Sequence, residues 1–206
     1  MLVGQLPFRP RNVRKGTYGT DCDHNVLPVG TAPTSTAPEE DRLMARQLMT
    51  TEQILSILRD TPDRLRCLAA DLTETSLHAA PEPGEWSVAE IAAHLRSCAD
   101  VWGRAIETIT VTDHPTIRAV SPTTWIKSTD YRELAFISSL RAFSEQRDQL
   151  LALLGDLPGQ GWSRSATVLG GGRPLELTVH SYANRMARHE RTHWRQLAKT
   201  VRALLD

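Results

Sequence analysis

Apolar residues recur at helical spacing in four stretches of the chain, all of them after residue 49. These stretches span residues 50–72, 87–110, 130–154 and 176–204. Within each stretch the apolar side chains lie three, four or seven positions apart, which places them on one face of an α-helix. Such a helix needs other elements to bury its apolar face. Four helices of this kind predict an all-α protein, built as a four-helix bundle.

The first two predicted helices begin with capping boxes. Thr50 is followed three residues later by Gln53, and Ser87 is followed in the same way by Glu90. In this arrangement the two side chains satisfy backbone N–H groups that have no partner inside the helix. Pro62 lies within the first helix and lacks the N–H of a helical hydrogen bond, so we expect a kink or an interruption there.

The segments between the helices predict loops and one short hairpin. Residues 111–128 contain two prolines, and we expect a loop. Residues 164–174 contain a short apolar segment followed by three glycines, which predicts a hairpin with a tight turn. The third helix is expected to begin near residue 130, with Leu134 and Ile137 in its apolar stripe.

The first 48 residues differ in composition from the rest. They hold five prolines and four glycines, and no apolar periodicity runs through them. A segment that buries little apolar surface cannot offset the entropy lost on ordering. We therefore expect residues 1–48 to form a disordered extension, and residues 49–206 to form the helical domain.

Charge and cysteine content narrow the class of protein. The chain carries 24 Lys and Arg against 24 Asp and Glu, so its formal net charge is zero. This balance argues against a protein that coats nucleic acid or an anionic membrane. No apolar run is long enough to span a bilayer, and three cysteines are too few for a disulfide framework. We expect a cytoplasmic protein that acts on a small molecule.

Two histidines in the last predicted helix are the strongest candidates for chemistry. His189 and His193 lie four positions apart, on one helix face, where two imidazoles can converge on one cation. Apolar neighbours on this face indicate that the pair points into the bundle, where a metal or a hydrogen-bond network would satisfy it. His180 precedes His189 by nine residues, so it points to the opposite side.

His94 is the candidate for a third metal ligand. It lies at the flank of the apolar stripe of the second helix, where it can face another helix; the alternative is an ordinary core histidine. Three protein ligands leave a coordination position open, which is typical of a catalytic site.

Glu190 completes an H-E-x-x-H sequence with the histidine pair. In zinc peptidases the glutamate of this motif is the general base. However, a further ligand is required downstream, and residues 194–205 contain neither Asp nor Glu. The sequence therefore argues against a peptidase. Glu190 remains a candidate base for hydrolysis, with a solvated surface charge as the alternative.

Several other side chains are expected to have structural roles. Cys98 follows His94 by one helical turn, so it can approach a metal or simply pack in the core. Trp86 is expected to act as a hydrophobic staple before the second helix, and Trp102 to line the core or a pocket. Four arginines of the last helix are expected on a solvated face, with an anion-binding role as the alternative: Arg185, Arg188, Arg191 and Arg195.

Two segments together resemble the DinB/YfiT-like superfamily of metalloenzymes. Residues 85–95 (EWSVAEIAAHL) are similar to its W-S-x-x-E-x-x-x-H-L segment, and residues 179–197 (VHSYANRMARHERTHWRQL) to its closing H-[DE]-x-x-H-x-x-Q helix. The resemblance implies a bundle with up-down-down-up connections, a homodimer, and zinc or nickel held by His94, His189 and His193.

The resemblance also suggests a reaction. Some members of the superfamily resemble S-transferases that use mycothiol or bacillithiol as co-substrate, which makes a thiol-dependent transferase the leading expectation. The alternatives are a hydrolase that uses a metal-bound hydroxide, with Glu190 as base, and a non-catalytic dimeric bundle. The chain departs from the family pattern one turn after His94, where Ser97 and Cys98 replace a common acidic residue.

Overall fold

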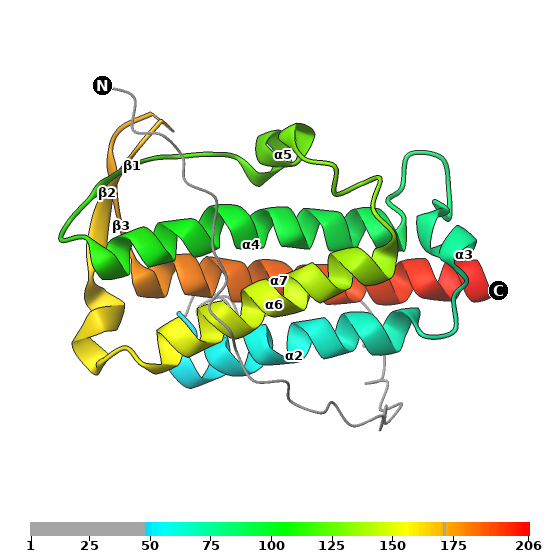
Figure 1. The fold of residues 1–206 in the computed structure, drawn as a ribbon, viewed down its shortest axis with the longest axis horizontal. Coiled ribbons are helices and arrows are strands. Elements are labelled where there is room, and N and C mark those ends of the chain that lie inside the picture. Colours follow the sequence, from blue (N-terminus) through cyan, green and yellow to red (C-terminus); the bar gives the residue numbers. More distant parts are fainter. Residues whose placement is uncertain (1–47, 171) are drawn as a thin grey trace, which may run out of the picture. The chain divides into compact units, whose positions relative to one another are not determined.

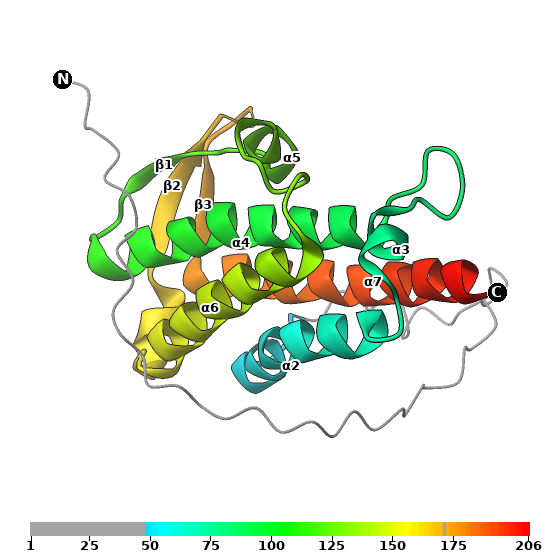
Figure 2. The ribbon, with the colours of Figure 1, turned by 45° about the vertical axis from the view of Figure 1, so that its right-hand side comes forward.

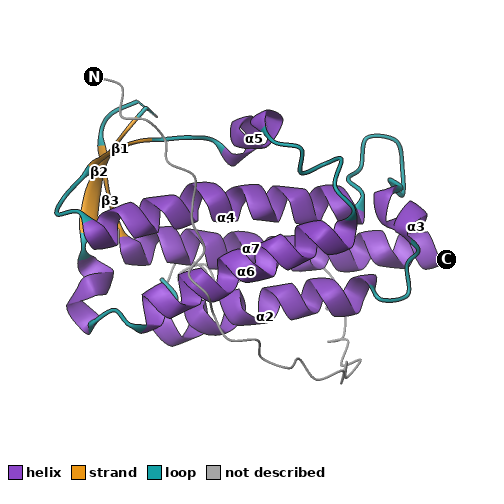
Figure 3. Ribbon diagram, viewed as in Figure 1, coloured by secondary structure: helices purple, strands orange, loops and turns teal. Residues whose placement is uncertain are grey.

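A computed structural model describes residues 48–170 and 172–206 of the chain. Long and short helices alternate along it, with three short strands between them (Figures 1 and 3). The long helices are α2 (Thr51–Ala69), α4 (Val88–Val111), α6 (Phe136–Gly155) and α7 (Val179–Leu205). The short elements are α3 (Glu74–His78), β1 (Thr116–Arg118), α5 (Pro122–Trp125), β2 (Ser165–Leu169) and β3 (Leu175–Thr178), with 3-10 turns at Ile126–Ser128 and Gly159–Ser163.

The four long helices lie side by side as a bundle (Figures 1 and 2). Helix α7 packs against α2 and α4, and α6 packs against the same two helices. The colour gradient of Figure 1 shows α2 and α7 running in one direction and α4 and α6 in the other. Each apolar face is thus covered by neighbouring helices, and the predicted four-helix bundle is confirmed.

The predicted helix starts at residues 50 and 87 are confirmed. The Thr50 hydroxyl accepts the Gln53 N–H, and the Gln53 side chain accepts the Thr50 N–H. Ser87 and Glu90 make the same reciprocal pair at the start of α4. Helix α2 continues through Pro62 without ending. Of the two expected effects, the interruption does not occur, and Pro62 lies on the buried face of the helix.

The third long helix begins at Phe136, so the predicted start near residue 130 is wrong. Side chains hold the preceding segment against α4 instead, since Trp125 Nε1 and Tyr131 Oη both donate to Asp100 Oδ2, at 2.9 and 2.7 Å. Ile137 was expected in the buried stripe, but its side chain is 63% exposed, and Phe136 is buried in its place.

A three-stranded sheet caps one end of α4 and α7 (Figure 1). Strands β2 and β3 pair antiparallel, which confirms the predicted hairpin; β1 pairs parallel to β2. Gly170 and Gly172 have φ angles of +109° and +106° at the hairpin turn, which glycine adopts without steric cost.

Two predictions about the segments around this sheet are corrected by the structure. Residues 111–128 are not only a loop, since they contain β1 and α5, and the last helix begins at Val179 because the preceding residues form β3.

The buried apolar residues form two groups, and their junction locates the site. On α4, Leu95 and Ala99 are the last residues of one group, and Cys98 is the first residue of the other. On α7, the second group ends at Ala187 and the first group resumes at Leu197. His94, His189 and His193 therefore lie at this junction, because α4 and α7 pack against each other there.

Residues 1–48 were expected to be disordered. All of them except Leu48 lie outside the described part of the chain, so this expectation stays a prediction. Across residues 48–170 and 172–206, no helix combines the length and apolar character that crossing a membrane requires.

Candidate metal centre

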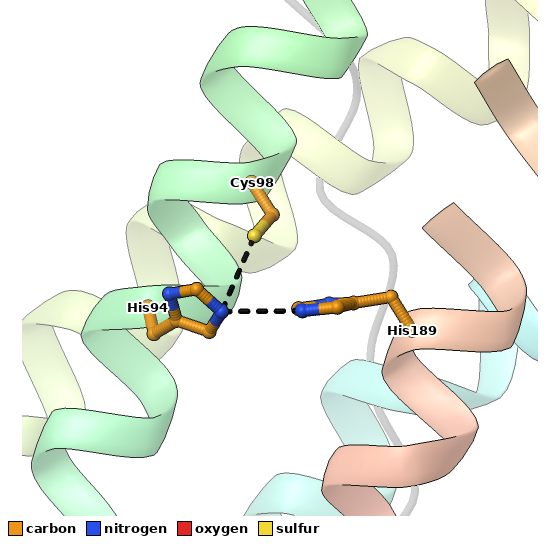
Figure 4. A group of neighbouring side chains, drawn as sticks. All are labelled: His94, Cys98 and His189. Carbon is orange, nitrogen blue, oxygen red and sulfur yellow. Dashed lines mark hydrogen bonds between the residues drawn. The ribbon is translucent and has the colours of Figure 1, made fainter. Parts of the chain in front are cut away.

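Three imidazole rings from α4 and α7 meet at one point in the bundle. His94 Nε2 lies 3.2 Å from His189 Nε2, and His193 Nε2 lies 3.1 Å from the same atom. The ring centroids are 5.0 Å apart for His94–His189, 5.0 Å for His94–His193 and 4.4 Å for His189–His193. Figure 4 shows His94 and His189 facing each other across the two helices. The sequence prediction thus named three residues that the fold brings together.

Local helix geometry explains how the rings converge. His94 follows the capping box of α4 by one further helical turn, and this turn packs against α7. His189 and His193 project from the same face of α7 because they are four positions apart. His180 instead contacts the Met49 carbonyl through Nε2 at 2.9 Å, so it lies away from the three rings, as the helical angle predicts.

Burial keeps the three imidazoles neutral near pH 7. Desolvation is the largest cause, followed by the repulsion that a protonated ring would meet from the neighbouring histidines; together they lower the pKa of His94 and of His189 to about 4. Burial also lowers the pKa of His193, although its hydrogen bond to Gln196 acts in the opposite direction. A neutral imidazole has a free nitrogen lone pair, which is the form that binds a metal.

Gln196 fixes the orientation of the third ring. His193 Nδ1 donates to Gln196 Oε1 at 2.7 Å, which leaves Nε2 free to act as a ligand. Such an outer partner commonly sets the tautomer of a metal-binding histidine. Gln196 was part of the family motif but was assigned no role from the sequence; its i+3 spacing from His193 is the signal that would have identified it.

The spacing of the nitrogen atoms suits a small divalent cation. Two nitrogen ligands of a tetrahedral zinc ion are about 3.3 Å apart, given Zn–N bonds of about 2.0–2.1 Å. The two Nε2 separations around His189 are 3.1 and 3.2 Å. Without a cation, two neutral rings at this distance could share only one hydrogen bond between them, so the donor set fits a metal.

Cys98 lies beside the histidines (Figure 4). Its Sγ is 3.6 Å from His94 Nε2, and ligand atoms of His94, Cys98 and His189 all lie within 4.8 Å of one another. The thiol is buried, and burial together with the charge of Glu190 raises its pKa. The expectation of a core position is confirmed, and the thiol also lies within reach of the imidazole cluster.

Two tryptophans line the cluster. The Trp86 ring stacks on His193, with centroids 6.1 Å apart and planes inclined by 4°, and meets the edge of His94 at 5.1 Å. The Trp102 ring lies edge-on to His189 at 5.1 Å. Trp86 packs on the core as a staple would, but its contact with two histidines was not predicted, because it depends on how the loop before α4 meets α7.

Glu190 is buried in the bundle, so the expectation of a solvated surface charge is wrong. Its carboxylate pairs with the Arg147 guanidinium, and both residues are 1% exposed. Burial raises the pKa of Glu190, while Arg147 and the Thr61 hydroxyl partly oppose that rise. The helical angle of about 100° from His189 turns the side chain toward α2 and α6. By contrast, the four arginines predicted on a solvated face are all exposed: Arg185, Arg188, Arg191 and Arg195.

Comparisons with known proteins agree with this architecture. The profile of the DinB superfamily matches residues 57–197. A search of curated proteins finds no significant match. Among solved structures, the chain is similar to YfiT from Bacillus subtilis, described as a probable metal-dependent hydrolase with an unusual four-helix bundle topology; the TM-score is 0.64 at 18% identity, covering 85% of this chain and 94% of YfiT.

A second solved structure is more distant. The mycothiol-dependent maleylpyruvate isomerase superposes with a TM-score of 0.56 at 10% identity, over 72% of this chain and 61% of that protein. At these identities, both structures establish a shared fold.

Proposed function

The chain belongs to the DinB superfamily, and on that premise we propose that it is a metal-dependent enzyme whose ligands are His94, His189 and His193. The observation that carries the proposal is the convergence of three neutral imidazoles, with Nε2 separations of 3.1 and 3.2 Å around His189. The proposal includes zinc or nickel as the metal, up-down-down-up connections, a homodimer and a cytoplasmic location. The opposite directions of the α2/α7 and α4/α6 pairs support the connection order.

We propose more specifically a transferase that uses a low-molecular-weight thiol of the mycothiol or bacillithiol type. A bound divalent metal would lower the pKa of such a thiol and stabilise its thiolate. The fold shared with a mycothiol-dependent isomerase supports this choice of co-substrate. The histidines hold the metal, Gln196 orients His193, and the rings of Trp86 and Trp102 pack against the cluster.

Hydrolysis is the second candidate, and the shared fold with YfiT favours it. In that case Glu190 would be the base. Because Arg147 binds the Glu190 carboxylate inside the bundle, a base role requires that pair to open. A Glu190→Gln variant with unchanged hydrolytic turnover would remove Glu190 from the mechanism.

The test combines metal analysis with two activity assays on the untagged full chain. We expect equimolar zinc or nickel, conjugation of mycothiol or bacillithiol to an electrophilic substrate, and loss of this activity on chelation. Hydrolysis of ester or amide substrates without thiol would favour the second candidate. If the chelator neither removes a metal nor lowers the melting temperature, the protein is a non-catalytic bundle with a histidine hydrogen-bond network.

A Gln196→Leu variant should bind the metal more weakly. Loss of the Nδ1 acceptor frees the His193 ring to rotate and to change tautomer, and loss of such outer partners typically lowers metal affinity about 10- to 100-fold. Competition with a chromophoric chelator measures the change. Gln196→Glu keeps an acceptor for Nδ1 and serves as the control. Equal affinity in Gln196→Leu and wild type would contradict a role for this hydrogen bond.

A further inference from the structure

Cys98 is a fourth donor atom beside the three histidines. It follows His94 by four residues on α4, so both side chains project from the same helix face. Figure 4 shows the Cys98 sulfur and the His189 ring approaching the same nitrogen of His94. The Sγ–Nε2 distance to His94 is 3.6 Å, and the cysteine is 2% exposed.

The distance between Cys98 Sγ and His94 Nε2 suits two ligands of one cation, as do the distances between the histidine nitrogens. In a tetrahedral zinc site, a sulfur at about 2.3 Å and a nitrogen at about 2.0–2.1 Å from the metal are about 3.6 Å apart. One ligand atom each from His94, Cys98 and His189 lies within 4.8 Å of the others. Two helices therefore supply a mixed set of nitrogen and sulfur donors: His94 and Cys98 from α4, and His189 and His193 from α7.

We propose that Cys98 binds the same metal ion as the histidines, as a thiolate in the resting protein. This inference rests on the proposed metal site and adds a ligand to it. When the ion binds, the S–H bond of Cys98 breaks, a sulfur–metal bond forms, and the proton leaves to the buffer. Metal uptake by the wild type should consequently release one proton more than uptake by a variant without the thiol.

A thiolate ligand has consequences for metal choice and chemistry. It makes the site softer, which favours zinc or cobalt over magnesium or manganese. Cys98 together with the three histidines would give the ion four protein ligands, the number of a tetrahedral site. A co-substrate thiol or a water molecule would then have to add as a fifth ligand or displace Cys98.

Cobalt absorption of the full chain tests the proposal. Wild-type protein loaded with Co(II) should show a sulfur-to-cobalt charge-transfer band in the near ultraviolet, and Cys98→Ser should lose the band while the histidines still bind cobalt. Cys22 and Cys67 remain in this variant, so loss of the band assigns it to Cys98. Ala105→Ser, which adds a hydroxyl at another buried position of α4 in the same core group, should keep the band.

Zinc X-ray absorption of the wild type gives a second readout that needs no variant. We expect one sulfur scatterer at about 2.3 Å beside the nitrogens. A band that persists in Cys98→Ser, or equimolar cobalt without a band and zinc without a sulfur neighbour in the wild type, would overturn ligation by Cys98 while leaving the histidine site intact. A wild type that binds neither metal would refute the proposed function itself, and the cysteine ligand with it.

Discussion

Replacing His189 by alanine should reduce metal affinity by more than 100-fold, the largest effect on metal binding expected from a single substitution. Its Nε2 lies within 3.2 Å of the Nε2 atoms of both His94 and His193, so its loss removes the central donor. Loss of an outer partner alone typically costs about 10- to 100-fold, and loss of a ligand should cost more. Equilibrium dialysis against a competing chelator measures the affinity, and circular dichroism verifies the fold.

His180→Ala is the matched control for this prediction. His180 lies on the same helix, nine residues before His189, and contacts the Met49 carbonyl rather than the cluster. We expect it to retain metal with the affinity of the wild type, even if its stability falls slightly. Stoichiometric metal in His189→Ala, bound as tightly as in His180→Ala, would show that the imidazole cluster is not the metal site.

Replacing Arg147 by methionine should lower the free energy of unfolding by about 3–5 kcal/mol at neutral pH. Arg147 is 1% exposed and pairs with Glu190, and its Nη1 also contacts Met186 Sδ at 3.1 Å. Without the guanidinium, the Glu190 carboxylate is left buried without its cationic partner. Urea denaturation followed by circular dichroism measures the change.

The same variant should regain stability on acidification. Burial already raises the pKa of Glu190, and the Arg147→Met substitution removes the cation that opposes that rise. The folded variant then binds a proton that the unfolded chain releases, so its stability increases as the pH falls toward the unfolded pKa. Adding Glu190→Gln removes the charge and should restore most of the loss at neutral pH.

Arg141→Met is the control on the same helix. Arg141 pairs with Glu145 at 3.2 Å, but the two side chains are 81% and 63% exposed. An exposed pair of this kind contributes little, so we expect a change within about 0.5 kcal/mol. If Arg147→Met and Arg141→Met had equal effects, the buried pair would not contribute to stability as proposed.

The sequence predicted the helices well where their signals are local. The capping residues Thr50 and Ser87 compete for backbone N–H groups only a few positions away, so their effect is readable without the fold. The start of α6 was missed because Asp100, thirty-one residues before Tyr131, holds the preceding segment by a side-chain hydrogen bond. Strand β1 was missed for the same reason, since its three residues pair only with distant β2.

The candidate site also combines features that the sequence predicted with features that depend on the fold. Helical periodicity alone placed His189 and His193 on one face and His180 on the other, because those angles follow from the pitch of a single helix. The position of His94 at the flank of an apolar stripe made it the third candidate, which the motif resemblance also named, and the packing of α4 on α7 determined that its nitrogen reaches His189. Trp86 stacks on His193, and Glu190 is buried against Arg147. Both contacts join residues that lie far apart in the sequence, so no local pattern predicts them.

The sequence by itself therefore determined the four helices, their apolar faces, and which histidines share a face. Only the tertiary structure decided which side chains meet across helices: the third imidazole, the Cys98 thiol, the tryptophan walls and the partner of Glu190. The physical reason is that helix geometry is set by hydrogen bonds within about four residues, whereas the relative rotation of two helices depends on side-chain packing along their entire contact.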